Sequence, residues 1–189
     1  MTDKKSICVY CGSHPGSDPD YMAQGTLLGA QIAKSGFRLV YGGGTWGIMG
    51  AVAHGCLDAG GEVLGVIPEF LVNHEGRREE LNILTELRIT KDMHERKGLL
   101  FGESDAFVAL PGGIGTLEEL VEVMTWAQLG RHSKPIVMAS LKGFWKPLEN
   151  LLEQMDQNGF IHSGDKLKPI VLEDINEVVP AIEKLIATF

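Results

Sequence analysis

The stretch Ala109-Leu110-Pro111-Gly112-Gly113-Ile114-Gly115-Thr116-Leu117-Glu118-Glu119 joins a predicted strand to a predicted helix. Residues 105–110 form an apolar run typical of a buried strand, and residues 116–129 have a helical pattern. Glycines allow a ligand to approach the backbone, and the first N–H groups of a helix attract anions. Glu119 follows one turn into this helix. A phosphate-binding turn beside a carboxylate indicates chemistry on a nucleotide.

The rest of the chain repeats this alternation of strand and helix. Apolar runs typical of strands occupy residues 6–10, 37–41, 63–68, 106–110, 135–139 and 169–172, with a weaker, alternating run at 84–89. Helical patterns occupy residues 20–35, 47–59, 92–103, 116–129, 144–157 and 174–187, and Gly36 and Gly60 lie where two of these helices would end. The pattern predicts an α/β fold: a Rossmann-like, doubly wound, mostly parallel sheet of about seven strands with helices on both faces. No linker or repeat divides residues 1–189, so we expect a single domain.

Composition limits the partners and the compartment. The chain has 189 residues and a formal net charge of -8, which argues against a nucleic-acid partner. No secretory signal is recognisable, and no apolar run approaches the ~20 residues that cross a bilayer. We therefore expect a cytoplasmic protein without a membrane partner.

Cys8 and Cys11 form a C-x-x-C pattern, and Cys56 is the third cysteine. A thioredoxin-like or zinc-binding function is conceivable, but there is no second cysteine pair and no histidine at ligand spacing nearby. Cys8 alternates with apolar residues in a predicted strand. Buried structural thiols are therefore the favoured interpretation, and we expect neither a metal nor a cofactor.

Three predicted strands end in unusual loops, which should meet at one edge of a parallel sheet. The first ends in Cys11-Gly12-Ser13, the second in residues 41–50, and the third in the motif quoted above. Gly42-x-Gly44-x-x-Gly47 matches the dinucleotide pattern, with Glu62 about twenty residues on, but it follows the second strand rather than the first. The alternatives are a tight turn or, as we prefer, a second backbone-lined wall of a nucleotide pocket. Ser13, Gly43, Gly44 and Gly112 are accordingly predicted to bind substrate.

Two charged motifs have a structural and a functional interpretation. Thr116 and Glu119 have the spacing of a helix capping box, yet the glycines before them favour a functional Glu119. Arg96 and Lys97, in Met93-His94-Glu95-Arg96-Lys97, could form a solvated helix face. Their place near a helix start opposes the helix dipole, which a bound anion would correct.

Together these motifs resemble the LOG family of cytokinin riboside 5′-monophosphate phosphoribohydrolases. MHERK, PGGIGTLEE, YGGGTWGIMG and TWAQLG carry the resemblance, which extends from Ser6 to about Leu172. The family implies a Rossmann-like homodimer that cleaves the N-glycosidic bond of AMP or N6-modified AMP, giving free base and ribose 5-phosphate. It implies a nucleotide N-glycosidase similar to AMP nucleosidase. Members are often labelled "possible lysine decarboxylase", but no lysine here has a recognisable pyridoxal-phosphate context.

The resemblance also assigns roles to residues. Arg96 and Glu119 match the catalytic pair of the family. Positions that match substrate-binding residues are Lys97, Gly113, Ile114, Gly115, Thr116, Leu117, Glu118 and Thr125, with a looser match at Glu75. Ile114 replaces the tyrosine of plant members, and residues 73–90 form a longer segment here, so base preference is open. The alternative function is a nucleotide-binding or sensing protein without hydrolysis.

Cleavage of a glycosidic bond builds positive charge on the ribose and negative charge on the base. We expect the Glu119 carboxylate to stabilise the ribose cation or to orient a water. Arg96 stays protonated, so its role must be electrostatic or hydrogen-bonding. Phosphate held by Gly113, Gly115 and Thr116 would position the ribose.

Overall fold

The computed structural model describes residues 4–72, 74, 79–161 and 169–187. Its core is one seven-stranded sheet in the order β4-β3-β2-β1-β5-β6-β7, in which every pairing is parallel. The strands are β1 (Ser6–Tyr10), β2 (Arg38–Tyr41), β3 (Val63–Pro68), β4 (Glu86–Thr90), β5 (Ala106–Ala109), β6 (Ile136–Ala139) and β7 (Ile170–Leu172). This confirms the predicted α/β fold and its strand positions to within two residues.

The α-helices of the described residues are α1 (Asp20–Lys34), α2 (Gly47–Asp58), α3 (Met93–Gly102), α4 (Ile114–Gln128), α5 (Lys146–Gln157) and α6 (Val178–Ile186). Short 3-10 helices occur at Glu69–Leu71, Glu80–Ile83, Leu141–Gly143 and Ile175–Glu177. Gly36 and Gly60 follow α1 and α2 with positive φ angles of 78° and 79°, as expected for glycines that end helices. The helix predicted at 174–187 instead starts with a 3-10 turn, in which the Asp174 carboxylate accepts from the Asn176 amide at 2.9 Å.

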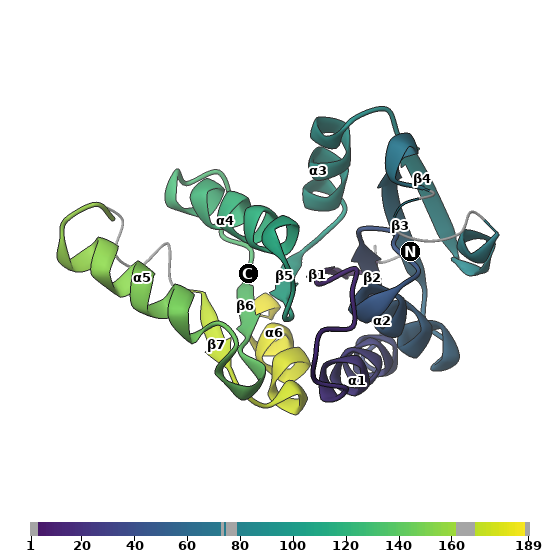
Figure 1. Ribbon diagram of the computed structural model, residues 1–189, viewed down its shortest axis with the longest axis horizontal. Coiled ribbons are helices and arrows are strands. Elements are labelled where there is room, and N and C mark those ends of the chain that lie inside the picture. Colours follow the sequence, from purple (N-terminus) through teal and green to yellow (C-terminus); the bar gives the residue numbers. More distant parts are fainter. Residues whose placement is uncertain (1–3, 73, 75–78, 162–168, 188–189) are drawn as a thin grey trace.

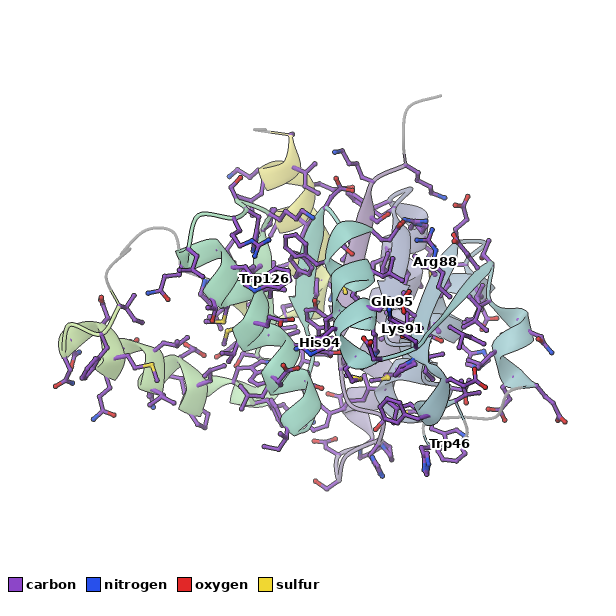
Figure 2. All side chains as sticks on the ribbon, turned by 90° about the horizontal axis from the view of Figure 1, so that it is seen from above. Trp46, Arg88, Lys91, His94, Glu95 and Trp126 are labelled. Atoms are coloured by element: carbon purple, nitrogen blue, oxygen red, sulfur yellow. The ribbon has the colours of Figure 1, made fainter. Side chains whose placement is uncertain are left out.

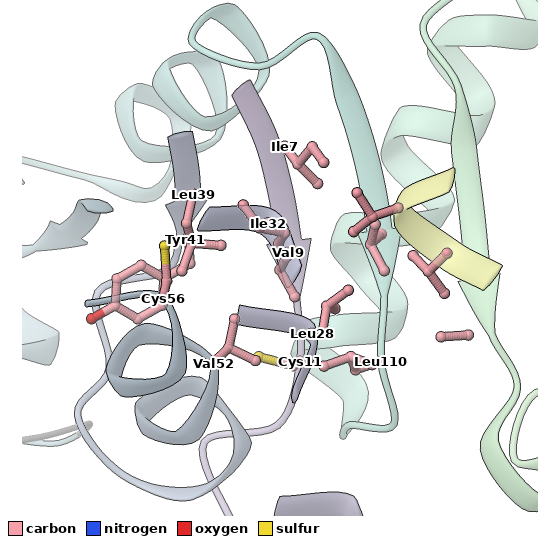
Figure 3. Close-up of a cluster of buried hydrophobic side chains, with 14 of the residues drawn as sticks. Ile7, Val9, Cys11, Leu28, Ile32, Leu39, Tyr41, Val52, Cys56 and Leu110 are labelled. Atoms are coloured by element: carbon pink, nitrogen blue, oxygen red, sulfur yellow. The ribbon is translucent and has the colours of Figure 1, made fainter. Parts of the chain in front are cut away.

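Helices cover both faces of the sheet, as Figure 1 shows, with α3 and α4 above it and α1, α2 and α6 below. Successive strand residues point to opposite faces. Ile7 and Val9 of β1 pack into the core cluster that includes Leu28 and Val52 of α1 and α2 (Figure 3). Cys8 belongs to the other cluster, with residues of α3, α4 and α5. Burial on both faces explains why the strands are almost wholly apolar.

The direction of chain winding reverses at β1. The chain runs outward from β1 through β2 and β3 to β4, then returns through α3 to β5 on the opposite side of β1. Ligands in open α/β sheets bind beyond the carboxyl ends of the strands at such a reversal. The loops after β1 and β5 are therefore the expected location of a site.

The three cysteines are buried and free. Cys8 and Cys11 belong to core clusters on opposite faces of the sheet, so their side chains do not face each other. Burial raises the pKa of the Cys56 thiol to about 11. These observations agree with structural thiols and not with a C-x-x-C redox pair.

A network of partly exposed charges lies at the amino ends of the strands. Arg38 Nη2 contacts Glu103 Oε2 at 2.6 Å, and Arg88 Nη1 contacts the other Glu103 oxygen at 2.6 Å. Glu86 pairs with both arginines, at 3.5 Å and 2.8 Å. The network ties the start of β2 to β4 and to the end of α3.

Candidate active site

Helix α4 begins two residues earlier than its sequence predicts. It starts at Ile114, and Gly113 is its N-cap without a side-chain hydrogen bond. Thr116 is therefore inside the first turn, and Glu119 follows on the buried side of the helix. The capping-box interpretation of Thr116 and Glu119 is wrong, because neither residue occupies the position that a capping box requires.

Helix α3 has a side-chain cap of a related kind, with Asp92 as its N-cap. The Asp92 carboxylate accepts a hydrogen bond from the Glu95 amide at 2.9 Å, and the Glu95 carboxylate accepts one from the Lys91 amide at 3.0 Å. The same hydrogen bond, to the Glu95 amide, is the main reason that the pKa of Asp92 is lowered. Asp92 and Glu95 place negative charge at the start of α3, which offsets the unfavourable interaction of Arg96 and Lys97 with the helix dipole. The start of α3 by itself therefore does not require a bound anion.

Arg96 is a buried arginine that reaches three separate elements. Its Nε donates to the Val66 carbonyl in β3, and its Nη2 donates to the Gly42 carbonyl after β2, both at 3.2 Å. A Cβ at position 42 would collide with this guanidinium. The solvated-face interpretation of Arg96 is therefore wrong: the side chain crosses over the carboxyl ends of two strands.

The guanidinium also pairs with Glu119 of α4. Arg96 Nη1 lies 3.2 Å from Glu119 Oε1, and the two side chains are only 5% and 8% exposed. Buried charges are stable only when they are paired and hydrogen-bonded, so each residue depends on the other. The pairing brings together the two residues that the resemblance assigns to catalysis.

Lys97 forms a second ion pair with α4, nearer to solvent. Its Nζ lies 2.7 Å from Glu118 and 3.0 Å from Glu122. Hydrogen bonding to Glu118, and then to Glu122, raises the pKa of Lys97. Glu118 and Lys97 thus meet beside the buried pair, and Glu122 is an ion-pair partner rather than a solvated charge.

The loops after β1 and β5 are bonded to each other and to α2. The Gly12 amide donates to the Pro111 carbonyl, and the Met49 amide donates to the Gly12 carbonyl, both at 3.1 Å. A Cβ at Gly112 would lie 2.7 Å from Thr116 Cβ and 2.9 Å from the Gly12 amide. Gly112 is therefore required for the close approach of the two loops.

A pocket of about 230 Å³ opens between these loops and the ion pair. Its lining combines the start of α4 with the loop after β1 and the buried pair: Cys11, Gly12, Ser13, Met49, Arg96, Gly113, Ile114, Gly115, Thr116 and Glu119. The first N–H groups of α4 have no acceptor within the helix. The pocket therefore places hydrogen-bond donors, a carboxylate and a guanidinium around one space.

Seven residues predicted from the sequence line this pocket: Ser13, Arg96, Gly113, Ile114, Gly115, Thr116 and Glu119. Four further residues are chain neighbours of lining residues but do not line the pocket: Lys97, Gly112, Leu117 and Glu118. Thr125 lies further along α4, where its hydroxyl donates to the Val121 carbonyl at 2.7 Å. Gly43 and Gly44 also lie outside the lining, and a Cβ at Gly43 would lie 2.9 Å from the Ile67 Cβ, which gives Gly43 a packing role. Glu75 is outside the described residues.

The pocket also contains three residues that the sequence reasoning missed: Cys11, Gly12 and Met49. Cys11 and Gly12 precede Ser13 in a loop that was recognised as a strand end. Met49 lies two residues after the last glycine of Gly42-x-Gly44-x-x-Gly47. The unusual loops after β1 and β2 were therefore the sequence signal for these residues. Met49 itself lies beyond the β2 loop, in the first turn of α2.

Neutral side chains lie beneath the carboxylate. Burial, followed by the charge of Glu119, raises the pKa of the Cys8 thiol. Burial also raises the pKa of Tyr10 well above its usual value, with further contributions from Cys8 and Glu119. Both groups therefore stay protonated near neutral pH, and Cys8 is not a thiolate nucleophile.

The dinucleotide interpretation of Gly42-x-Gly44-x-x-Gly47 is not supported. Glu62 precedes β3 at the opposite edge of the sheet and pairs with Lys4 at 3.0 Å, so it cannot contact a ribose at this pocket. Within the described ranges, no three His, Cys, Asp or Glu side chains gather as they would around a metal ion. No helix in those ranges combines the length and apolar character needed to cross a bilayer.

These observations define a Rossmann-like protein with a glycine-rich helix start and a buried carboxylate–guanidinium pair at the reversal of its sheet. The sequence model of the family described as "possible lysine decarboxylase" matches residues 49–182. A cytokinin riboside 5′-monophosphate phosphoribohydrolase from Rhodococcoides fascians is 44% identical over 94% of this chain and 89% of its own length. The enzyme LOG from Oryza sativa subsp. japonica is 40% identical over 98% of this chain and 75% of its own length. The chain belongs to this family, the LOG family indicated by its motifs.

A solved structure gives the same fold. The molybdenum cofactor carrier protein from Chlamydomonas reinhardtii has a TM-score of 0.72 and 25% identity, over 97% of this chain and 99% of that chain.

The family description names a decarboxylase, whose usual cofactor forms a Schiff base with a lysine. Among the described residues, the pocket lining contains no lysine. The residues therefore do not fit that chemistry.

Proposed function

We propose that this protein hydrolyses the N-glycosidic bond of AMP or of N6-modified (cytokinin) adenosine 5′-monophosphates, releasing the free base and ribose 5-phosphate. The observation that carries the proposal is the buried Arg96–Glu119 pair beside the glycine-rich start of α4. The two relatives at 44% and 40% identity, which are named as phosphoribohydrolases, support the same reaction.

The start of α4 provides the phosphate site in this proposal. The amide groups of Ile114, Gly115 and Thr116 belong to the helix turn whose N–H groups have no intrahelical acceptor. The helix dipole adds a favourable potential for the 5′-phosphate. Binding energy from the phosphate then holds the ribose in position, away from the bond that breaks.

Glu119 acts on the sugar. When the C1′–N9 bond breaks, its electron pair leaves with the base, and the ribose carries positive charge that the carboxylate stabilises. A water oxygen bonds to C1′, its proton passes through Glu119 to solvent, and the departing base takes up a proton. Arg96 keeps its proton throughout and orients Glu119, and its remaining N–H groups face the ribose hydroxyls or the base.

Replacement of Glu119 by alanine tests the mechanism. Glu119→Ala should release no free adenine from AMP, as followed by chromatography, while circular dichroism shows a folded protein. The matched control is Glu153→Ala, an exposed carboxylate on α5, which should keep wild-type turnover. Turnover by Glu119→Ala at the wild-type rate would exclude the mechanism. AMP binding by the wild-type protein without any adenine release would instead favour the non-hydrolytic binding or sensing function.

A comparison of nucleotides tests the substrate. Turnover of AMP, N6-isopentenyl-AMP, GMP and CMP by the wild-type protein separates a general nucleotide N-glycosidase from an adenine-specific or cytokinin-specific enzyme. The phosphate and ribose sites are common to all four nucleotides. Differences in kcat/KM therefore report on the base alone.

We also propose a homodimer in the cytoplasm. Val121 on the exposed side of α4 and Leu129, which caps the helix, are apolar residues that a second copy of the chain would cover. Trp126 adds little to this exposed face, because its ring packs on Phe101 with centroids 4.7 Å apart. Sedimentation of the wild-type protein and of Val121→Asp tests the assembly, which the introduced charge should dissociate.

The free thiols of the chain agree with a reducing compartment.

A further inference from the structure

The pocket is small for a whole nucleotide. Its volume of about 230 Å³ lies below the roughly 300–1,000 Å³ of sites that bury most of a drug-sized ligand. In the proposed function, phosphate and ribose fill the space between the start of α4 and Glu119. The base must then extend beyond this space, to the rim of the pocket.

An exposed indole lies on the β2–α2 loop at this edge of the sheet. Trp46 is the N-cap residue of α2 and is 47% exposed, whereas Trp145 is 5% exposed. Figure 2 shows the Trp46 side chain projecting outward from the ribbon. The third tryptophan, Trp126, packs against Phe101 on the other side of the active site, so Trp46 is the most solvent-accessible indole.

The loop that carries Trp46 is held in place on both sides. The Gly42 carbonyl accepts from Arg96, and the Thr45 hydroxyl donates to the Glu80 carboxylate at 2.6 Å. Gly47 has a φ of 58°, and a Cβ there would meet the Ser13 carbonyl carbon at 2.5 Å and the His14 carbonyl carbon at 2.6 Å. The loop thus packs directly on the loop that lines the pocket. A surface fixed in this way loses little conformational entropy when it binds a ligand.

Strand order places the loop that carries Trp46 and the start of α4 on opposite sides of the loop after β1. β2 and β5 flank β1 on its two sides, and neighbouring strands are ~4.8 Å apart, so their ends lie about 10 Å from each other. Ile114, which follows β5, lines the pocket and is 82% exposed. Ser13, which follows β1, lies between the two. Trp46 is not among the lining residues, but its neighbour Gly47 packs on Ser13, so apolar side chains flank the β1 loop on both sides.

We propose that Trp46 is a specificity-determining residue that contacts the base, stacking on the purine and covering an apolar N6 substituent. The inference rests on the proposed function, since it assumes that ribose 5-phosphate occupies the pocket. An indole face binds any base by stacking and gains further contact from an added isoprenoid chain. The start of α4, Arg96 and Glu119 contact the phosphate and the ribose.

The test separates the base from the rest of the substrate. Trp46→Ala should lower kcat/KM for AMP roughly tenfold, the effect of one lost base–aromatic contact, and more for N6-isopentenyl-AMP. Inhibition by ribose 5-phosphate, which has no base, should be unchanged. Trp46→Phe should keep most of the activity, because it retains an aromatic face. Phe160→Ala, which removes an exposed aromatic ring after α5, is the matched control and should resemble wild type.

Fluorescence provides a second measurement that does not need turnover. AMP should quench the indole emission of the wild-type protein, and Trp46→Phe should remove that quenching. Quenching by AMP in a wild-type protein that releases no adenine would support the Trp46 contact while rejecting the proposed function. Unchanged kcat/KM of Trp46→Ala for both nucleotides would overturn the proposal, as would an equal weakening of ribose 5-phosphate inhibition.

Discussion

Two groups of ion pairs lie at opposite edges of the same sheet and differ in their exposure to solvent. At the carboxyl edge, Arg96 and Glu119 are 5% and 8% exposed. At the amino edge, the side chains of Arg38, Arg88, Glu86 and Glu103 are between 21% and 42% exposed. Water screens the second group, and exposed pairs usually contribute little to stability. A buried pair is retained at a cost in desolvation, and here it borders a pocket, which is the basis for its proposed catalytic role.

The largest expected difference between the two edges is in activity. Glu119→Gln keeps the shape and a hydrogen-bonding oxygen but removes the negative charge that stabilises the ribose cation. We expect kcat for AMP to fall at least about 10³-fold, as it does when other transition-state stabilising groups are lost. Glu103→Gln removes a carboxylate from the amino-edge network and should keep kcat within about twofold. Equal losses of kcat in Glu119→Gln and Glu103→Gln would show that charge at both sheet edges affects turnover through protein stability alone.

The next difference is in stability. Arg96→Met leaves Glu119 charged and buried and removes donors from the Val66 and Gly42 carbonyls, so the free energy of unfolding should fall by about 3–5 kcal/mol. Arg38→Met, at the amino edge, should lower it by about 1 kcal/mol or less. Urea denaturation measures both values.

A double variant sharpens this result. Arg96→Met combined with Glu119→Leu replaces the buried pair by apolar side chains, which is often neutral for stability. We expect much of the lost stability to return, but no adenine release. Recovery of activity would contradict the catalytic assignment of the pair.

Much of this molecule could be predicted from sequence patterns. Apolar runs alternating with helical ones identified the seven strands, because strands buried on both faces have few polar residues. The position of the pocket also followed, since the Gly112–Gly115 turn comes directly after a buried strand. Helix termini were less accurate. Thr116 and Glu119 match a capping box by spacing, but Gly113 ends the extended backbone earlier and the helix starts at Ile114.

Contacts between distant segments could not be predicted from local patterns. The sequence pattern allowed a solvated face for Arg96 because a second basic residue, Lys97, follows it directly. The burial of Arg96 depends on the carbonyl groups of Val66 and Gly42, which are 30 and 54 residues away in the chain. Met49 reaches the pocket only because its amide bonds to Gly12. Such residues are identified by the packing of loops rather than by periodicity.

Substitutions at two adjacent glycines of the carboxyl edge, Gly112 and Gly113, should separate an effect on folding from an effect on ligand binding. A Cβ at Gly112 would crowd Thr116 and Gly12, so Gly112→Ala should lower the free energy of unfolding by roughly 1–3 kcal/mol. A Cβ at Gly113 meets nothing within 4 Å, so Gly113→Ala should unfold like wild type. Its KM for AMP should nevertheless rise, because the phosphate approaches the backbone there. A Gly113→Ala protein with wild-type KM would place the phosphate elsewhere.

The smallest expected effect is the pH dependence of the amino-edge network. Hydrogen bonding to Arg38, and then to Arg88, lowers the pKa of Glu103. A carboxyl group whose pKa is lower in the folded state binds fewer protons there than in the unfolded chain. It therefore stabilises the fold above its unfolded pKa, near ~4.3, and loses this effect as the pH falls through its folded pKa. Relative to wild type, Glu103→Gln should lower the free energy of unfolding by up to about 1 kcal/mol at pH 7. This difference should shrink as the pH falls from about 5 to 3. Urea denaturation across that range measures it, and a difference that grew in acid would mean that the arginines do not hold Glu103 in its charged form.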